Sequence, residues 1–129
     1  MNVGATQNTI LIVEDDDALA QLMGERLSKE GFIVSIVRDG LNAQAAIRNQ
    51  NPDLVVLDIM LPGIDGFETC RRIRQTQNGQ HIPVVFITGY ADNAARVKGK
   101  EVGCNDFLVK PVDSMEMLAR VKNLVIVRR

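Results

Sequence analysis

Short hydrophobic runs alternate with longer amphipathic segments along the whole chain. Five runs predict strands: Thr9–Val13, Phe32–Val37, Leu54–Leu57, Ile82–Ile87 and Asp106–Val109. The continuous apolar character of the first and third runs is typical of strands that are buried on both faces. In the first segment between runs, the apolar residues Leu19, Leu22, Met23 and Leu27 follow helical spacing. The pattern predicts an α/β fold in which helices cover both faces of a parallel sheet.

Each expected helix is preceded by a residue that can cap its N-terminus. These residues are Asp16 or Asp17, Asp39, Asp65, Asp92, and Asp113 or Ser114. The helix expected from Asp92 to Val102 is the weakest, because it contains Gly99 and few large apolar side chains. The last helix carries a clear apolar stripe, which includes Met117, Val121 and Val125.

Connections between parallel strands are right-handed, which leaves few arrangements of five strands. The doubly wound, flavodoxin-like order 2-1-3-4-5 fits best, as a (βα)5 fold. It places the first and third strands at the switch point, where ligands bind beside the carboxyl ends of the strands.

Charged and polar residues stand where four of these five runs end. Glu14 and Asp15 follow the first run, Asp58 follows the third, Thr88 the fourth and Lys110 the fifth. Because the carboxyl ends of parallel strands share one edge, three carboxylates and an ammonium group are expected together there. Carboxylates brought together repel each other unless a cation neutralises them, and Mg²⁺ takes such oxygen ligands beside a phosphate.

Asp58 is the most informative of these residues. It ends an apolar strand and precedes a loop with Pro62 and Gly63, so its carboxylate is expected to be held rigidly and to remain reachable. Such a carboxylate can act as a nucleophile and form an acyl phosphate. Taken singly, Lys110 is more typical of a surface lysine, and Thr88 of a capping or turn residue. Their joint placement favours a metal and phosphate site.

Composition fits one soluble domain in the 129 residues, at a net charge of −1. We expect no nucleic acid or membrane partner, because there is no basic field and no apolar stretch of membrane-spanning length. Cys70 and Cys104 lie in no metal-ligand spacing, which favours free thiols and a cytoplasmic location. Residues 1–8 are expected to be a flexible start, 9–127 the domain, and 128–129 a basic tail where a linker to an output domain could begin.

Four stretches carry a resemblance to a known family: Ile10–Asp16, Pro52–Gly66, Pro83–Gly89 and Asp106–Pro111. Over about Thr9 to Val127, the chain resembles the receiver domain of response regulators in two-component signalling systems. The resemblance implies that Asp58 accepts a phosphoryl group from a phosphohistidine on a histidine kinase or phosphotransfer protein. It also implies that Mg²⁺ or Mn²⁺ is held by Asp15, Asp58 and the main-chain carbonyl of Met60, with Glu14 acting through water.

In the same resemblance Lys110 pairs with Asp58 and the phosphoryl group, and the Lys110-Pro111 peptide is cis. Thr88 and Phe107 take the place of the switch residues, so that Thr88 moves toward the phosphoryl group and Phe107 swings inward. Tyr90 is either a gate to Asp58 or an exposed loop aromatic. The face formed by the helix from Asp92, the strand from Asp106 and the last helix is expected to control an output domain or protein, and it is also the expected face of a homodimer.

Two other functions remain open at this stage. A Mg²⁺-dependent phosphohydrolase would use the same nucleophile, although its second acid is replaced by Met60, two residues after Asp58. A flavin-binding domain would share the architecture, but the acidic edge would repel the phosphate of FMN. The resemblance favours a signalling switch with only slow autophosphorylation and autodephosphorylation.

Overall fold

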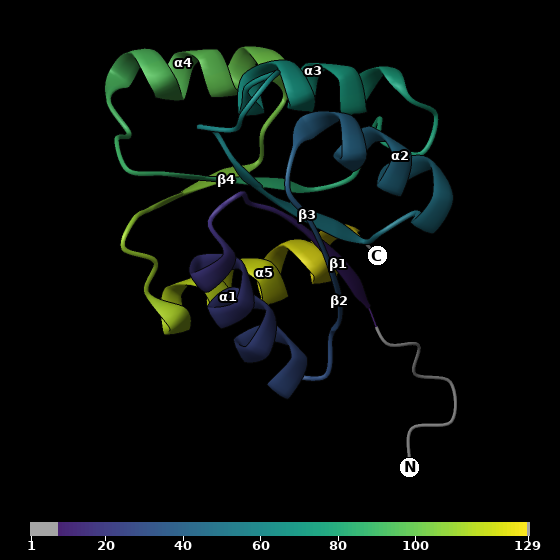
Figure 1. The fold of residues 1–129 in the computed structure, drawn as a ribbon, viewed down its shortest axis with the longest axis vertical. Helices are drawn as coiled ribbons and strands as arrows, with labels where there is room; N and C mark the ends of the chain where they lie inside the picture. Colours follow the sequence, from purple (N-terminus) through teal and green to yellow (C-terminus); the bar gives the residue numbers. More distant parts are fainter. Residues whose placement is uncertain (1–7, 129) are drawn as a thin grey trace.

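The computed structural model describes residues 8–128, which form five strands and five helices in strict alternation (Figure 1). The elements are β1 (Thr9–Val13), α1 (Asp17–Lys29), β2 (Ile33–Val37), α2 (Gly40–Gln50), β3 (Leu54–Asp58), α3 (Gly66–Gln75), β4 (Val84–Thr88), α4 (Asn93–Val102), β5 (Asp106–Val109) and α5 (Ser114–Arg128). The flexible start predicted for residues 1–8 and the tail at 128–129 lie, apart from Asn8 and Arg128, outside the described residues.

The strands form one parallel sheet in the order β2-β1-β3-β4-β5, which confirms the predicted flavodoxin-like topology. Helices α1 and α5 cover one face, and α2, α3 and α4 cover the other (Figure 1). Two apolar clusters result. Alternate residues of β1 enter each of them, Leu11 on the α2–α3 side and Ile12 on the α1–α5 side. Burial on both faces explains why this strand has no polar alternation in its sequence.

The structure settles two alternatives at helix starts. The Asp16 side chain accepts a hydrogen bond from the Leu19 amide and caps α1. The Asp113 side chain accepts one from the Glu116 amide at the start of α5. Both are N-terminal caps, which satisfy amides that lack a partner within the helix.

The predicted start of the fourth strand at Ile82 is two residues too early. Pro83 has no amide hydrogen, so β4 begins at Val84, whose amide donates to the Asn105 side chain at 2.8 Å. Two strands also extend one residue further than predicted, since Asp58 is the last residue of β3 and Thr88 is the last residue of β4.

Helix α4 is held mainly at its C-terminal end. Among its residues only Gly99 is buried. Gly103, which follows α4, is held by the Arg74 side chain of α3, which donates a hydrogen bond to the Gly103 carbonyl at 3.1 Å. Arg74 also donates to the Ile82 carbonyl (2.6 Å) and to the side chain of Asn105 (3.1 Å). The other residues of α4 are exposed or partly exposed, which agrees with the few large apolar side chains in its sequence.

Gly66 allows the start of α3 to approach the end of β3. Its amide donates to the Ile59 carbonyl at 2.7 Å. A methyl group at this position would lie 2.4 Å from the Asp58 carbonyl oxygen and 2.6 Å from the Ile59 Cα. Both neighbours are backbone atoms that cannot rotate away, so this contact fixes the backbone that carries the Asp58 side chain.

We therefore expect Gly66→Ala to lower the free energy of unfolding by about 2 kcal/mol or more, since overpacking forces backbone shifts. Gly89→Ala is the matched control, because nothing lies within 4 Å of the added methyl group. Urea denaturation of both variants measures the difference. Equal stability of the two variants would contradict the tight contact at Gly66.

Candidate functional site

The carboxyl ends of the strands bring the predicted residues to one edge of the sheet. Asp58 pairs with Ile87 in the register of β3 and β4, and Thr88 pairs with Val109 in that of β4 and β5. Glu14 and Lys110 directly follow β1 and β5. Four groups that are far apart in sequence are therefore neighbours, as the strand pattern predicted.

The Asp58 carboxylate is engaged through both oxygens. Oδ2 accepts a hydrogen bond from the Lys110 ammonium at 2.9 Å, and Oδ1 accepts one from the Met60 amide at 3.0 Å. The residue is only 1% exposed, so the prediction that it remains reachable is wrong for this state. The Lys110 ammonium and the Met60 amide contact the two oxygens of this buried carboxylate.

Glu14 is the most deeply buried charged residue of the site, at 0% exposed. Its Oε2 accepts from the Asp16 amide at 3.0 Å, while Oε1 lies 3.5 Å from the Lys110 nitrogen. Among the described residues, Oε1 has no hydrogen-bond partner. Desolvation, with the nearby Asp58 carboxylate, raises the pKa of Glu14 from 4.5 to about 7. A buried oxygen without a partner is costly, so this position is suited to a cation or a proton.

Glu14, Asp15 and Asp58 form an acidic cluster with one oxygen from each residue within 4.8 Å of the others. Asp15 is exposed and completes the cluster from the solvent side. Hard divalent cations prefer oxygen ligands of this kind, and Mg²⁺ commonly keeps some of its waters. The donor set and the unpartnered Glu14 oxygen therefore fit a divalent cation such as Mg²⁺.

Lys110 balances part of this negative charge. Burial lowers its pKa, but the hydrogen bond to Asp58 and the attraction of Asp58 and Glu14 outweigh burial, so that its pKa is raised. Its backbone amide donates to the Thr88 carbonyl at 2.8 Å, and the peptide bond to Pro111 is cis, as the resemblance implied. Lys110 is thus a positioned cation, charged at any neutral pH.

The Thr88 hydroxyl is engaged with the backbone of the turn after β4. It donates to the Tyr90 carbonyl at 3.0 Å and accepts from the Tyr90 amide at 3.1 Å. These two bonds fix the turn after β4, a motif in which a threonine side chain bonds to nearby backbone. The Tyr90 side chain is 73% exposed, which agrees with the exposed-loop alternative.

Phe107 already packs inward. Its ring centroid lies 5.6 Å from that of Phe86, and Arg96 lies over its other side. Gly99 of α4 provides the space, because a methyl group there would lie 2.5 Å from the ring. The ring therefore already lies inward in this state, without the inward swing that was predicted for Phe107. From the sequence, Gly99 is visible only as a weak helical residue, so this contact was not predicted. An isolated glycine within a helical pattern is the signal that could have indicated it.

The described helices include none that is long and apolar enough to cross a membrane. Cys70 is a free, buried thiol, and burial raises its pKa to about 11. Cys104 is also free and half-buried.

Comparison with known proteins gives consistent matches. The family of the response regulator receiver domain matches residues 10–122. The phosphate regulon transcriptional regulatory protein PhoB of Rhizobium meliloti is 39% identical over 116 residues, which cover 90% of this chain and 51% of that protein. The response regulator PleD of Caulobacter vibrioides is 41% identical over 115 residues, which cover 89% of this chain and 25% of that protein. The chain thus spans about half or less of the length of these relatives.

Solved structures agree in fold. A putative response regulator from Chloroflexus aurantiacus has a TM-score of 0.89 at 36% identity, over 94% of this chain and 99% of that one. The receiver domain of sensor histidine kinase PA1611 from Pseudomonas aeruginosa has a TM-score of 0.86 at 29% identity, over 93% and 98%, and holds a magnesium ion in its active-site cleft. With the sheet order, the acidic edge and the family match in agreement, this chain belongs to the response regulator receiver domains.

Proposed function

We propose that this domain is a phosphorylation-controlled switch in which Asp58 receives a phosphoryl group from a phosphohistidine of a histidine kinase or phosphotransfer protein. The observation that carries the proposal is the joint placement of Asp58, Lys110 and the acidic pair Glu14 and Asp15 at one sheet edge. An ordinary structural role for each residue taken separately does not explain why a buried nucleophile, a cation in contact with it and a carboxylate oxygen without a partner lie together.

The chain's residues divide the work of the transfer. An Asp58 oxygen attacks phosphorus, the bond from phosphorus to the imidazole nitrogen breaks, and its electron pair returns to the imidazole. Lys110 leaves its contact with the carboxylate and pairs with an oxygen of the phosphoryl group. Asp15, Asp58 and the Met60 carbonyl would hold Mg²⁺ or Mn²⁺, with Glu14 acting through water, and the cation would neutralise charge on the phosphoryl oxygens.

The switch begins at Thr88. A phosphoryl group on Asp58 brings acceptor oxygens and negative charge to the end of the neighbouring strand. The Thr88 hydroxyl then exchanges its bond to the Tyr90 carbonyl for one to a phosphoryl oxygen. Release of this turn frees the N-terminal part of α4, whereas Arg74 keeps the C-terminal end in place. The face of α4, β5 and α5 thereby transmits the change to an output domain or protein.

The alternative of a phosphohydrolase is less well supported. Met60 stands two residues after the nucleophile with 74% of its surface exposed, so no acid is available there to protonate a leaving group. The relatives are response regulators, which agrees with a switch rather than an enzyme of metabolism. A homodimer through the face of α4, β5 and α5 and a cytoplasmic location stay predictions.

Phosphorylation of Asp58 has a direct test. When the protein is incubated with Mg²⁺ and acetyl phosphate, intact-mass spectrometry should show a single addition of about 80 Da, the mass of HPO₃. Asp58→Asn should abolish this addition. Asp65→Asn is the matched control, because asparagine caps a helix about as well as aspartate. Labelling that persists in Asp58→Asn, or is lost equally in Asp65→Asn, would contradict the assignment.

Magnesium affinity should depend on pH through Glu14. Its raised pKa of about 7 means that a proton competes with the cation below neutrality. The apparent affinity should therefore rise from pH 6 to pH 8 and level off above, measured by calorimetry, and Glu14→Gln should weaken binding and flatten this dependence. Equal wild-type affinity at pH 6 and pH 8 would argue against a role for Glu14.

The raised pKa of Glu14 also has a consequence for stability when no metal is bound. Because the folded pKa of about 7 exceeds the ordinary value of 4.5, the folded state retains the proton that the unfolded chain has released. This group's contribution to stability should thus fall as pH rises from about 4.5 to about 7 and change little above. Urea denaturation in EDTA should show the fall in wild type and lose it in Glu14→Gln.

Tyr90 provides a readout of the Thr88 step, because it is the only tyrosine and the chain has no tryptophan. Phosphorylation should change the tyrosine fluorescence of wild type and of Thr88→Ser, which keeps the hydroxyl. Thr88→Ala should be phosphorylated at Asp58 without that change. A full fluorescence response in phosphorylated Thr88→Ala would show that the hydroxyl does not couple the two positions.

A further inference from the structure

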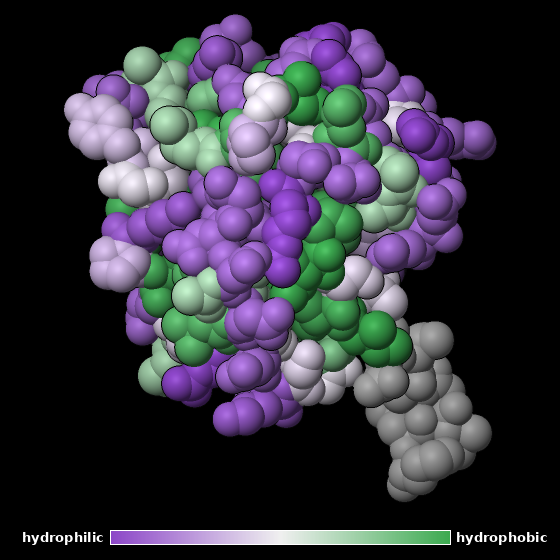
Figure 2. All heavy atoms as spheres, viewed as in Figure 1, coloured by the Kyte–Doolittle hydropathy of each residue, from purple (hydrophilic) through white to green (hydrophobic). Residues whose placement is uncertain are grey.

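The open edge of the sheet at β2 is an apolar surface that the phosphorylation site does not use. Ile33 is 49% exposed, and each of the other four β2 residues is partly exposed. In the view of Figure 2, hydrophobic side chains gather in a strip over β2, between polar regions. An exposed strand edge with such side chains is a template for pairing with another strand.

The backbone of β2 offers hydrogen bonds on its open side. The Ile33 amide donates to the Asn8 carbonyl at 2.9 Å, and the Val37 carbonyl accepts from the Glu14 amide at 3.1 Å. The backbone amide and carbonyl groups of Ile33 and Val37 therefore face β1. Backbone groups alternate along a strand. The amide and carbonyl groups of Val34 and Ile36 therefore face away from β1, toward the open edge.

The opposite edge of the same sheet is protected. In β5, Asp106 forms an ion pair with Arg120 at 2.6 Å, and the strand is followed at once by Lys110 and Pro111. Charges and proline are the usual means of preventing strand addition. The sequence of β2 is Ile-Val-Ser-Ile-Val and contains neither.

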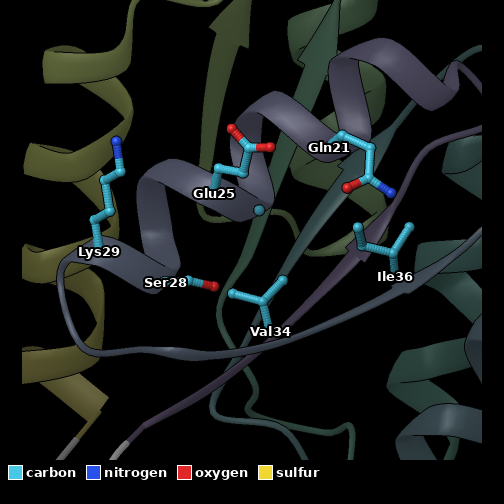
Figure 3. Close-up of a pocket in the computed structure, with 7 residues that line it drawn as sticks. Gln21, Glu25, Ser28, Lys29, Val34 and Ile36 are labelled. Carbon is cyan, nitrogen blue, oxygen red and sulfur yellow. The ribbon is translucent and has the colours of Figure 1, made fainter.

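A hollow of about 390 Å³ lies beside this edge, between α1 and β2. Val34 and Ile36 lie below α1 in this hollow, while Gln21, Glu25, Ser28 and Lys29 project from the helix around it (Figure 3). The rim carries one acid, one base and two neutral side chains. It therefore presents no net charge that would repel a second identical rim.

We propose that β2 pairs antiparallel with β2 of a second copy of this chain, so that the two sheets become continuous across a two-fold axis. The strand suits this partner because it is nearly palindromic. Pairing centred on Ser35 places Ile33 opposite Val37, and Val34 opposite Ile36 of the second copy. Val34 and Ile36 then exchange both backbone hydrogen bonds with their counterparts, and these are the groups that face the open edge.

This pairing also matches the side chains. Val34 and Ile36 pack on the α1 side of the sheet in both copies, so the apolar floors of the two hollows become one surface. Contact between identical patches is the usual arrangement of a two-fold dimer. The β2 edge is separate from the face of α4, β5 and α5, so dimerisation leaves the proposed output face open (Figure 1).

A cysteine cross-link tests the register. The axis places Ser35 opposite itself in a non-hydrogen-bonded pair, where Cα atoms lie about 4.5 Å apart, within reach of a disulfide. Ser35→Cys should form a covalent dimer on mild oxidation. The control Ile33→Cys should not, since its two sulfurs would be about four residues apart along the strands, roughly 13 Å. Wild type measures any background from Cys70 and Cys104. Equal cross-linking of both variants, or of neither, would overturn the register.

Sedimentation velocity across a concentration series tests the dimer itself. Wild type should become dimeric with rising concentration, and Ile33→Lys should stay monomeric with unchanged circular dichroism. Val97→Lys, at another exposed apolar residue on α4 (58% exposed), should dimerise like wild type. A wild type that is monomeric throughout, or a dimer broken by Val97→Lys and not by Ile33→Lys, would overturn the proposal.

Discussion

The structure depends on how three carboxylates are kept together at one edge of a parallel sheet. Glu14 and Asp58 are buried beside each other, and Lys110 supplies a positive charge in direct contact with both. One ammonium group does not neutralise three acids, and burial, together with the nearby Asp58 carboxylate, raises the pKa of Glu14. This excess of negative charge, with a buried oxygen that has no partner, fits a divalent cation, on which the proposed transfer of a phosphoryl group to Asp58 rests.

Burial of the nucleophile gives Lys110 a second role. In this state the lysine and the Met60 amide occupy both oxygens of Asp58. The ion pair orients the carboxylate and also covers it. A divalent cation bound at the cluster of Glu14, Asp15 and Asp58 would add positive charge beside Asp58, and Lys110 is the residue that would pair with the incoming phosphoryl group.

Much of this could be predicted from sequence, because strand ends are visible as the point where an apolar run meets a charged residue. Asp58 and Lys110 were found in this way, and topology then placed them together. Side-chain direction was less accessible. The bonds of Thr88 to Tyr90 and the inward packing of Phe107 depend on a turn and on space at Gly99, neither of which periodicity encodes. The exposure of Asp58 was mispredicted for the same reason, since it depends on where the Lys110 side chain lies.

The central claim is that one cation joins Asp15 and Asp58 at the end of the sheet. A crystal structure of the protein grown with Mn²⁺, with anomalous diffraction measured at the manganese edge, tests it most directly. The account predicts one anomalous peak in contact with the Asp15 and Asp58 carboxylates and the Met60 carbonyl. A peak elsewhere, or none at saturating Mn²⁺ near pH 8, would contradict it.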